Sequence, residues 1–360
     1  MIKFIQGNCI DKIQELKDNS IDCVVSSPPY FGLRDYGTAQ WQGGDPNCEH
    51  KKSRFNYSIS DKQKSNNGSS GLGAYKNGEF CKCGAKRIDK QLGLEPTYQE
   101  HIQNIVELFR AMKPKLKDTA TIWLNYGDSY AATVNGTKAK DIKNDDRGFV
   151  DKPFSTIQGS IKPKDLVMIP NRIAIALQDD GWWIRSEIIW HKPNPMPEST
   201  KDRPTNCHEK IWLITKNKKY YYDADAIKEP FAQGTHLRYH NQKDILKNQK
   251  GSFVAHAGKK SNSAMKPVIS GDKRNKRNVW TITTKPFKEA HFATFPKDLI
   301  EPCIKAGCPE GGVVLDPFGG SGTTGIVAQS LNRTTILIEL NPEYIEIAKK
   351  RIDKELGMFK

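Results

Sequence analysis

The chain has 360 residues, with 56 lysines and arginines against 41 aspartates and glutamates, so its formal net charge is +15. This length can bury a sizeable core in one large domain or two modest ones, and the surplus of positive charge favours a polyanionic partner. A membrane span and a secreted disulfide scaffold are not expected, because no run of about 18 apolar residues occurs, the start MIKFIQGNC lacks a signal-peptide core, and the cysteines number only eight.

The N-terminal part alternates apolar strands with an amphipathic helix. Strands are predicted at 2–5 and 21–25, with a helix at 9–16 between them. The second strand runs into Ser27-Pro28-Pro29-Tyr30, in which two prolines remove two N–H donors and fix φ. The segment Ser27–Tyr30, called SPPY below, is therefore expected to stop pairing and hold a rigid shape at the end of a strand, although a merely stiff turn would have the same composition.

Residues 41–90 interrupt this pattern with a polar insertion rich in Lys, Ser, Asn and Gly. Its two ends carry Cys48 and His50, and Cys81 and Cys83. Three thiolates and one imidazole would form a closed tetrahedral set, so the sequence predicts a structural zinc ion here. Neither pair has the common C-x-x-C spacing, and four unrelated surface residues remain the alternative interpretation.

The middle of the chain returns to alternating strands and helices. Helical periodicity is predicted at 96–112 and 166–177, and strands are predicted at 119–124, 182–190 and 210–215. Residues 228–280 then turn polar and basic, and nothing periodic marks a core there. A loop and a helix are predicted over 292–306.

The C-terminal part forms one compact nucleotide-binding pattern. The apolar strand 313–315 runs into Asp316, a glycine-rich turn follows, and a helix begins at about Thr323. A second apolar strand, 335–338, ends in Glu339, and a helix at 341–356 closes the chain. Glycines let the backbone approach a ligand closely, and an acid at the end of the second strand suits a ribose diol. The pattern predicts a nucleoside cradle; an ordinary tight turn is the alternative for a lone glycine-rich loop.

Together, SPPY and Asp316–Thr324 (DPFGGSGTT) closely resemble the S-adenosylmethionine-dependent DNA amino-methyltransferases, and the order with SPPY first resembles their β group. The resemblance implies an α/β fold: a doubly wound, mostly parallel seven-stranded sheet of the Rossmann-like methyltransferase type, with permuted motif order and inserted loops. It implies three regions: a catalytic half at 1–227, a target-recognition region at 228–290, and an S-adenosylmethionine-binding half at 291–360.

The resemblance also implies the functional residues. Ser27, Pro28, Pro29 and Tyr30 are the expected catalytic residues: Ser27 Oγ and the Pro28 carbonyl accept the two protons of an exocyclic amino group, and Tyr30 stacks on a base flipped out of the duplex. The expected cofactor-binding residues are Asn8, Phe295, Asp316, Pro317, Phe318, Gly319, Gly320, Ser321, Gly322, Thr323, Glu339 and Asn341. Asn8 occupies a position where the family often has Asp.

The function so implied is sequence-specific methylation of double-stranded DNA, most directly at cytosine N4, because the motif begins with Ser27. Adenine-N6 methylation is the alternative, and a non-catalytic DNA-binding protein, an RNA methyltransferase or a protein glutamine methyltransferase are further hypotheses. The resemblance admits a cognate restriction endonuclease and a homodimer as partners. The small number of cysteines favours a reducing cytoplasm, and the protein is expected to be encoded by a bacterium, an archaeon or a phage.

One cysteine bears on whether a covalent thiolate mechanism is possible. Pro302-Cys303 looks like the nucleophile motif of cytosine carbon-5 methyltransferases, but Cys303 lies inside a predicted helix before the cofactor strand. It is therefore predicted to be a small core residue.

Overall fold

The computed structural model describes residues 1–49, 81, 83–132, 150–151, 154–230, 273–285 and 294–357. The chain divides into two units, one made of Met1–Tyr222 with Asn278–Lys360 and the other of Asp223–Arg277. No helix in these described ranges is long and apolar enough to cross a membrane.

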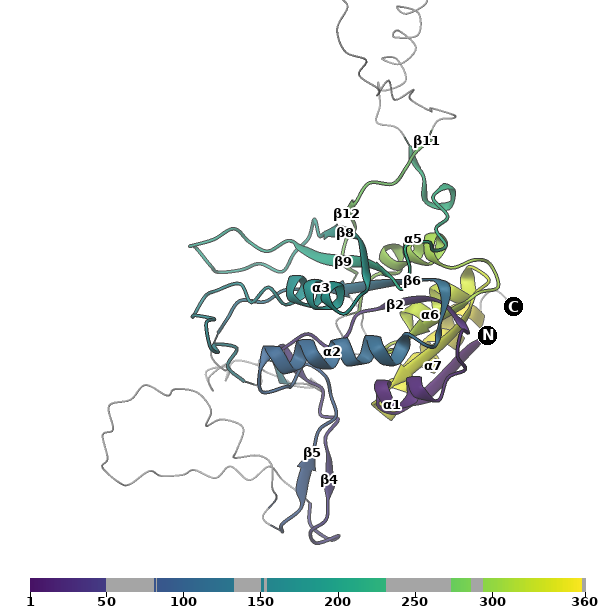
Figure 1. The fold of residues 1–360 in the computed structure, drawn as a ribbon. Helices are drawn as coiled ribbons and strands as arrows, with labels where there is room; N and C mark the ends of the chain where they lie inside the picture. The colour runs from purple at the N-terminus through teal and green to yellow at the C-terminus, as the bar shows by residue number, and fades with distance from the viewer. Residues whose placement is uncertain are drawn as a thin grey trace, which may run out of the picture. The chain divides into compact units, whose positions relative to one another are not determined.

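The larger unit is built on one eight-stranded sheet (Figure 1). In spatial order its strands are β1 (Ile2–Gln6), β14 (Thr334–Glu339), β13 (Val313–Asp316), β2 (Ile21–Ser26), β6 (Leu116–Tyr126), β9 (His208–Thr215), β8 (Trp183–His191) and β12 (Val279–Thr281). All pairings are parallel except those that β9 makes with β6 and β8. The predicted mostly parallel α/β sheet is therefore confirmed, with one strand more than the seven expected.

The additional strand is β12, which falls where the sequence showed no periodic core. It has only three residues, too few for an alternation to be recognised, yet its central Trp280 is 4% exposed. Its parallel pairing with β8 places Trp280 opposite Trp190. The chain thus rejoins the sheet at residue 279, within the 228–290 segment that was expected to form a separate region.

Helices cover both faces of this sheet. They are α1 (Cys9–Gln14), α2 (Tyr98–Met112), α3 (Ile169–Asp179), α5 (Lys297–Gly307), α6 (Thr323–Ser330) and α7 (Pro342–Leu356). Figure 1 shows α2 and α5 on opposite sides of β2 and β6. Helix α2 begins after Thr97, whose Oγ1 accepts the Glu100 N–H at 3.2 Å. Its buried face, which includes Ile105 and Phe109, joins the main core.

Three short two-stranded sheets accompany the main one. Within the larger unit, β3 (Arg34–Asp35) pairs with β7 (Val150–Asp151), and β4 (Gln40–Gln42) pairs with β5 (Lys86–Ile88). In the smaller unit, β10 (Glu229–Pro230) pairs with β11 (Lys273–Arg274) after a 3-10 turn at Asp225–Ile227. There the Glu229 carboxylate accepts hydrogen bonds from Arg274 and Arg277, which lowers its pKa against the opposing effect of burial. Of the expected target-recognition region 228–290, residues 231–272 and 286–290 lie outside the described residues.

The contact between α5 and β6 gives a test of the packing. A Cβ at Gly307 would overlap Thr121 Oγ1 and Trp123 Nε1, and Thr121 Oγ1 also donates to the Gly307 carbonyl at 3.0 Å. Overpacking of this kind costs about 1–3 kcal/mol, which exceeds the gain of about 1 kcal/mol from replacing a helical glycine by alanine. We therefore expect Gly307→Ala to lower the free energy of unfolding measured in urea. Gly357→Ala is the control, because nothing lies within 4 Å of its Cβ position. Equal stability of the two variants would contradict this packing.

Candidate active site

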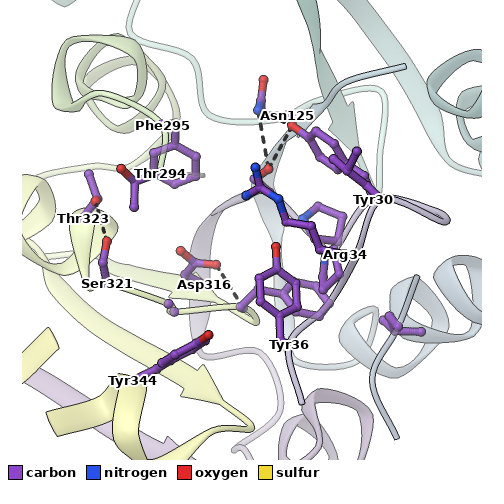
Figure 2. A pocket seen from close by; sticks show the side chains of 18 of the residues that line it. Tyr30, Arg34, Tyr36, Asn125, Thr294, Phe295, Asp316, Ser321, Thr323 and Tyr344 are labelled. Carbon is purple, nitrogen blue, oxygen red and sulfur yellow. Dashed lines mark hydrogen bonds between the residues drawn. The ribbon is translucent and has the colours of Figure 1, made fainter. Parts of the chain in front are cut away.

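The two sequence motifs meet at one edge of the sheet. The parallel strands β13 and β2 pair so that Leu315 lies opposite Val24, and their last residues are Asp316 and Ser26. Strand β14 ends beside them at Glu339. The carboxyl edge of an open α/β sheet is where such folds bind ligands. Here it opens into a cavity of about 690 Å³ that both SPPY and the glycine-rich loop line (Figure 2).

Asp316 holds the two motifs together. Its Oδ1 accepts hydrogen bonds from Ser26 Oγ at 2.6 Å and from the Phe318 N–H at 3.1 Å, while its Oδ2 accepts one from Thr324 Oγ1 at 2.6 Å. The residue is 2% exposed, and this burial raises the pKa of its carboxyl group from 3.8 to about 7. Asp316 therefore fixes the start of the loop, and both of its oxygens are already engaged.

The glycine-rich loop is anchored to β14. The Gly319 N–H donates to the Ile338 carbonyl at 2.7 Å, and the Gly320 N–H donates to Glu339 Oε2 at 2.9 Å. A Cβ at Gly319 would lie 2.9 Å from Leu337 Cβ, so only glycine allows this approach. The other oxygen of Glu339 accepts the Asn341 N–H at 2.9 Å. Burial raises the pKa of the Glu339 carboxyl group. These bonds fix that carboxyl group at the cavity wall.

A buried arginine from α7 supports the far side of the same loop. Arg351 Nη1 donates to Ser321 Oγ at 2.9 Å and to Thr323 Oγ1 at 2.8 Å. Arg351 is 9% exposed. Sequence reasoning did not find it, because it lies 28 residues or more beyond the loop and belongs to no local motif.

Most of the predicted catalytic and cofactor-binding residues line the cavity, but two do not. Those that line it are Asn8, Ser27, Pro28, Pro29, Tyr30, Phe295, Asp316, Pro317, Phe318, Gly319, Gly320, Ser321, Thr323 and Glu339. Gly322 instead is the N-cap of α6, with φ +76, and its Cβ position lies 3.0 Å from Ile352 Cδ1 of α7. Asn341 caps α7, with Oδ1 accepting the Glu343 N–H at 2.9 Å. Both residues therefore have structural roles at helix starts.

Asn8 reaches the cavity with its side chain already engaged. Its Oδ1 caps α1 by accepting the Ile10 N–H at 3.0 Å and the Asp11 N–H at 3.3 Å, and its Nδ2 donates to the Lys90 carbonyl at 3.3 Å. An Asn N-cap explains why this position accepts Asn in place of Asp.

The SPPY end of the cavity contains a hydrogen-bonded cluster. Tyr30 Oη donates to Glu209 Oε2 at 2.8 Å and accepts from Ser27 Oγ at 3.2 Å and from Asn125 Nδ2 at 3.0 Å. Asn125 Nδ2 also lies 2.9 Å from Glu209 Oε2, and Lys192 Nζ forms an ion pair with Oε1 of the same carboxylate. Burial and the adjacent Glu209 carboxylate raise the pKa of Tyr30 well above its usual value, so its hydroxyl keeps its proton.

The Tyr30 ring rests on a second buried layer. It stacks on Tyr126 with the ring centroids 4.5 Å apart. Tyr126 Oη lies 2.7 Å from His101 Nε2 and accepts the Phe31 N–H at 2.9 Å, while His101 Nδ1 lies 2.8 Å from Glu95 Oε2. His101 is fully buried. This arrangement clamps the backbone and the ring that follow the two prolines.

Several cavity residues were missed by the sequence reasoning. They are Asn125, Lys192, Glu209 and Tyr344, and Arg34, Tyr36 and Thr294 line the cavity beside them. Figure 2 shows Arg34 between Asp316 and Tyr30, with Tyr36 and Tyr344 in the lower part of the view. Asn125 could have been suspected, because it lies at the end of a predicted apolar strand in NYGDSY. Glu209 starts a strand that runs antiparallel, and no local pattern marks it.

Of the predicted zinc ligands, the structure brings Cys48, Cys81 and Cys83 together, with their Sγ atoms within 4.8 Å of one another. His50 lies outside the described residues.

Comparison with known proteins identifies the family. Residues 21–350 match the DNA methylase family of N6 and N4 methyltransferases. The chain is 39% identical over 350 residues to the Type II methyltransferase M.SmaI of Serratia marcescens, covering 97% of this chain and 90% of that protein. It is 38% identical over 350 residues to the Type II methyltransferase M.Cfr9I of Citrobacter freundii, covering 97% and 87%.

Solved structures agree in fold. The PvuII DNA methyltransferase, described as cytosine-N4-specific, superposes with a TM-score of 0.55 at 15% identity, covering 99% of this chain and 91% of that one. A putative DNA modification methylase from Thermus thermophilus, complexed with S-adenosyl-L-methionine, gives 0.50 at 16% identity, with 99% and 94% covered. The chain belongs to the DNA methylase family, which confirms the family predicted from SPPY and DPFGGSGTT.

The buried carboxyl group of Asp316 makes a prediction for pH dependence. Its folded pKa of about 7 exceeds the ordinary 3.8, so the folded protein binds this proton more tightly than the unfolded chain does. The stabilisation that this group contributes to the folded protein is therefore fully present below pH 3.8 and is lost as the pH rises from 3.8 to about 7. We expect Asp316→Asn, which cannot titrate, to flatten the fall in the free energy of unfolding between pH 4 and 7, measured by urea unfolding at each pH. Asp353→Asn removes an exposed carboxylate and should keep the wild-type profile; identical profiles for all three proteins would contradict the assignment.

Proposed function

We propose that this DNA methylase transfers a methyl group from S-adenosylmethionine to cytosine N4 of double-stranded DNA. The observation that carries the proposal is the single cavity of about 690 Å³ that SPPY and the glycine-rich loop line together. A methyl donor at the loop and an amino group at SPPY would then face each other within one cavity, and positioning of this kind supplies much of the rate.

The end of the cavity that the glycine-rich loop lines suits S-adenosylmethionine. At Gly319 a Cβ would collide with Leu337, so glycine lets the loop lie directly against β14 while it lines the cavity. We assign the methionine part to the backbone of this loop, the ribose hydroxyls to the carboxylate of Glu339, and packing near the ligand to Phe295. The bound sulfonium supplies a methyl group that is already activated for transfer. Asp316 contributes by holding the loop.

The SPPY end fits a flipped base. An exocyclic amino group is a weak nucleophile because its lone pair is conjugated with the ring, and accepting hydrogen bonds from its protons draws that lone pair out. Tyr30 Oη donates to Glu209, so it accepts from Ser27 Oγ–H. Ser27 Oγ also accepts from Asn125 Nδ2 at 3.5 Å, so this direction leaves one lone pair of Ser27 Oγ to accept an amino proton. The Pro28 carbonyl is assigned the second proton, and Tyr30 is assigned the stacking contact with the base.

A covalent cysteine mechanism finds no support at this cavity. Cys303 is 1% exposed inside α5, donates from Sγ to the Leu299 carbonyl at 3.5 Å, and is not among the described residues that line the cavity. Cys9 does line it, but burial raises the pKa of its thiol to about 12. Direct transfer to the amino group therefore accounts best for the site.

The choice of cytosine over adenine rests on Ser27 as the first residue of SPPY, and the fold shared with a cytosine-N4-specific enzyme is consistent with it. Since the relatives are Type II methyltransferases, we further propose that this protein modifies DNA alongside a cognate restriction endonuclease. The net charge of +15 suits duplex DNA, and we assign target recognition to the segment 228–290. A homodimer stays a prediction.

Ser27→Ala tests the acceptor role. It removes one acceptor from the amino group while sparing the glycine-rich loop, so we expect turnover to fall by about 10²-fold, the scale of one lost transition-state hydrogen bond, with the affinity for S-adenosylmethionine little changed. The measurement is single-turnover methylation of a plasmid substrate, with calorimetry for the cofactor. Cys303→Ser is the matched control and should stay active. A dead Cys303→Ser variant beside an active Ser27→Ala variant would overturn direct transfer.

The product tests the base. Nucleoside digests of DNA from cells that express the protein should contain N4-methylcytosine by mass spectrometry, and DNA from cells that express Ser27→Ala should contain far less. If the wild-type digest contained only N6-methyladenine, the assignment of the site would stand, but the methylated base would be adenine and not cytosine.

A further inference from the structure

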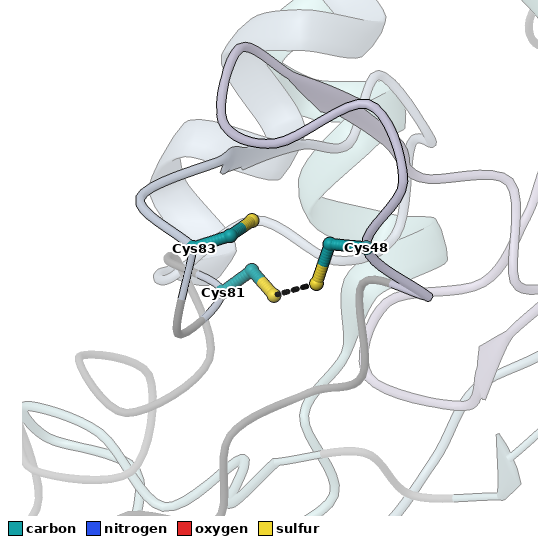
Figure 3. A group of neighbouring side chains, drawn as sticks. All are labelled: Cys48, Cys81 and Cys83. Atoms are coloured by element: carbon teal, nitrogen blue, oxygen red, sulfur yellow. Dashed lines mark hydrogen bonds between the residues drawn. The ribbon is translucent and has the colours of Figure 1, made fainter.

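Three cysteines from the two ends of the polar insertion converge outside the active site (Figure 3). Cys48 follows β4, while Cys81 and Cys83 precede β5. The Sγ atoms of Cys48 and Cys81 lie 3.7 Å apart although 33 positions separate the residues, and all three Sγ atoms fall within 4.8 Å of one another. None of the three lines the cavity described above.

The backbone around these cysteines is tightly folded. The Cys81 N–H donates to the Ala85 carbonyl at 2.8 Å and the Gly84 N–H donates to the Cys81 carbonyl at 2.9 Å, which forms a turn with Gly84 at φ +86. On the other arm, the Cys48 N–H donates to the Asp45 carbonyl at 3.0 Å. The two turns carry cysteines that face each other.

A glycine allows the two arms to approach. Gly44 has φ +76, and a Cβ there would lie 2.8 Å from Cys83 Sγ and 2.7 Å from the Ala85 nitrogen. Any other residue at this position would push the β4 arm away from the cysteines. Glycine at position 44 therefore allows the three thiols to lie close together.

The spacing of the sulfur atoms fits a tetrahedral ion. Zinc–thiolate bonds of about 2.3 Å at tetrahedral angles place two sulfur atoms about 3.8 Å apart, close to the 3.7 Å between Cys48 and Cys81. A disulfide would use only two of the three thiols and would leave the third without a function. Cys81 is moreover only 6% exposed although it belongs to an insertion.

We propose that Cys48, Cys81 and Cys83 bind a structural zinc ion that closes the β4–β5 hairpin at its loop end. Three thiolates supply three of the four positions of a zinc site, and a fourth donor completes it. The ion would close a long polar loop that has little apolar surface of its own to order it, as metals do in small domains.

The β4–β5 hairpin is connected to the active-site cavity by the residues that flank its two strands. Thr38 precedes β4, Lys90 and Gln91 follow β5, and all three line the cavity. Gln91 Nε2 donates to the Arg34 carbonyl at 2.8 Å, and Gln91 Oε1 accepts the Tyr36 N–H at 2.8 Å. The zinc ion would hold the two strands that deliver these residues to the cavity wall.

The test is the metal content of the full, untagged chain. After extensive dialysis we expect about one zinc per chain by elemental analysis, since one closed site binds one ion. Cys81→Ser and Cys83→Ser should each lose most of it, whereas Cys207→Ser, which changes a half-buried cysteine outside the cluster, should retain it. A metal content of the Cys81→Ser protein equal to wild type would overturn the proposal.

A second measurement needs no variant and so does not depend on whether the variants fold. Chelated wild-type protein titrated with Co²⁺ should develop thiolate-to-metal charge-transfer absorption that saturates at one equivalent, and Zn²⁺ should abolish it by displacement. The insertion should also become more sensitive to protease after chelation. Absence of the charge-transfer band, or isolation of a metal-free protein in which Cys48 and Cys81 form a disulfide, would reject the zinc site while leaving the proposed methyltransferase activity untouched.

Discussion

The hydrogen bond from Ser26 Oγ to Asp316 Oδ1 joins the ends of two central strands that are 290 positions apart in the chain. Both partners are buried, so the bond forms only when β2 and β13 pair along the middle of the sheet. It brings the residue before SPPY to the residue that starts the glycine-rich loop. The cavity therefore forms only when the central strands of the sheet have paired. The two motifs meet there although SPPY lies near the start of the chain and the glycine-rich loop near its end.

Buried polar side chains that pack against the two motifs form hydrogen bonds, and these hydrogen bonds hold both motifs in place. Arg351 supports the hydroxyls of Ser321 and Thr323 from α7, and the His101–Tyr126 pair supports the Tyr30 ring from below. An unpaired polar group at such depth would cost about 1–3 kcal/mol. Removing one of these partners would therefore loosen the motif above it, so these residues position the site without entering it.

The segments that the sequence singled out from short local patterns do line the cavity. SPPY, the glycine-rich loop and Glu339 each follow an apolar strand, and a strand that ends in special residues can be read from a short window. The helix-start roles of Gly322 and Asn341 were not foreseen, because membership of a motif does not tell which of its residues face the ligand. Strand β12 was missed because three residues carry no recognisable period, and Arg351 because its contacts are long-range.

The reversed strand β9 explains the largest omission. In a wholly parallel sheet the first residues of a strand lie at the amino edge, away from the ligand. Strand β9 runs antiparallel to both β6 and β8, so Lys210 pairs with Tyr126 and with Ile189. Its start therefore lies beside the ends of its neighbours. Glu209 thereby reaches Tyr30 and Asn125 at the carboxyl edge, and Lys192, just beyond the end of β8, reaches Glu209. The reversed direction of β9 thus places the acid Glu209 beside SPPY, between an amide and a base from the carboxyl ends of its two neighbours, and only the pairing of the sheet could reveal the position of Glu209.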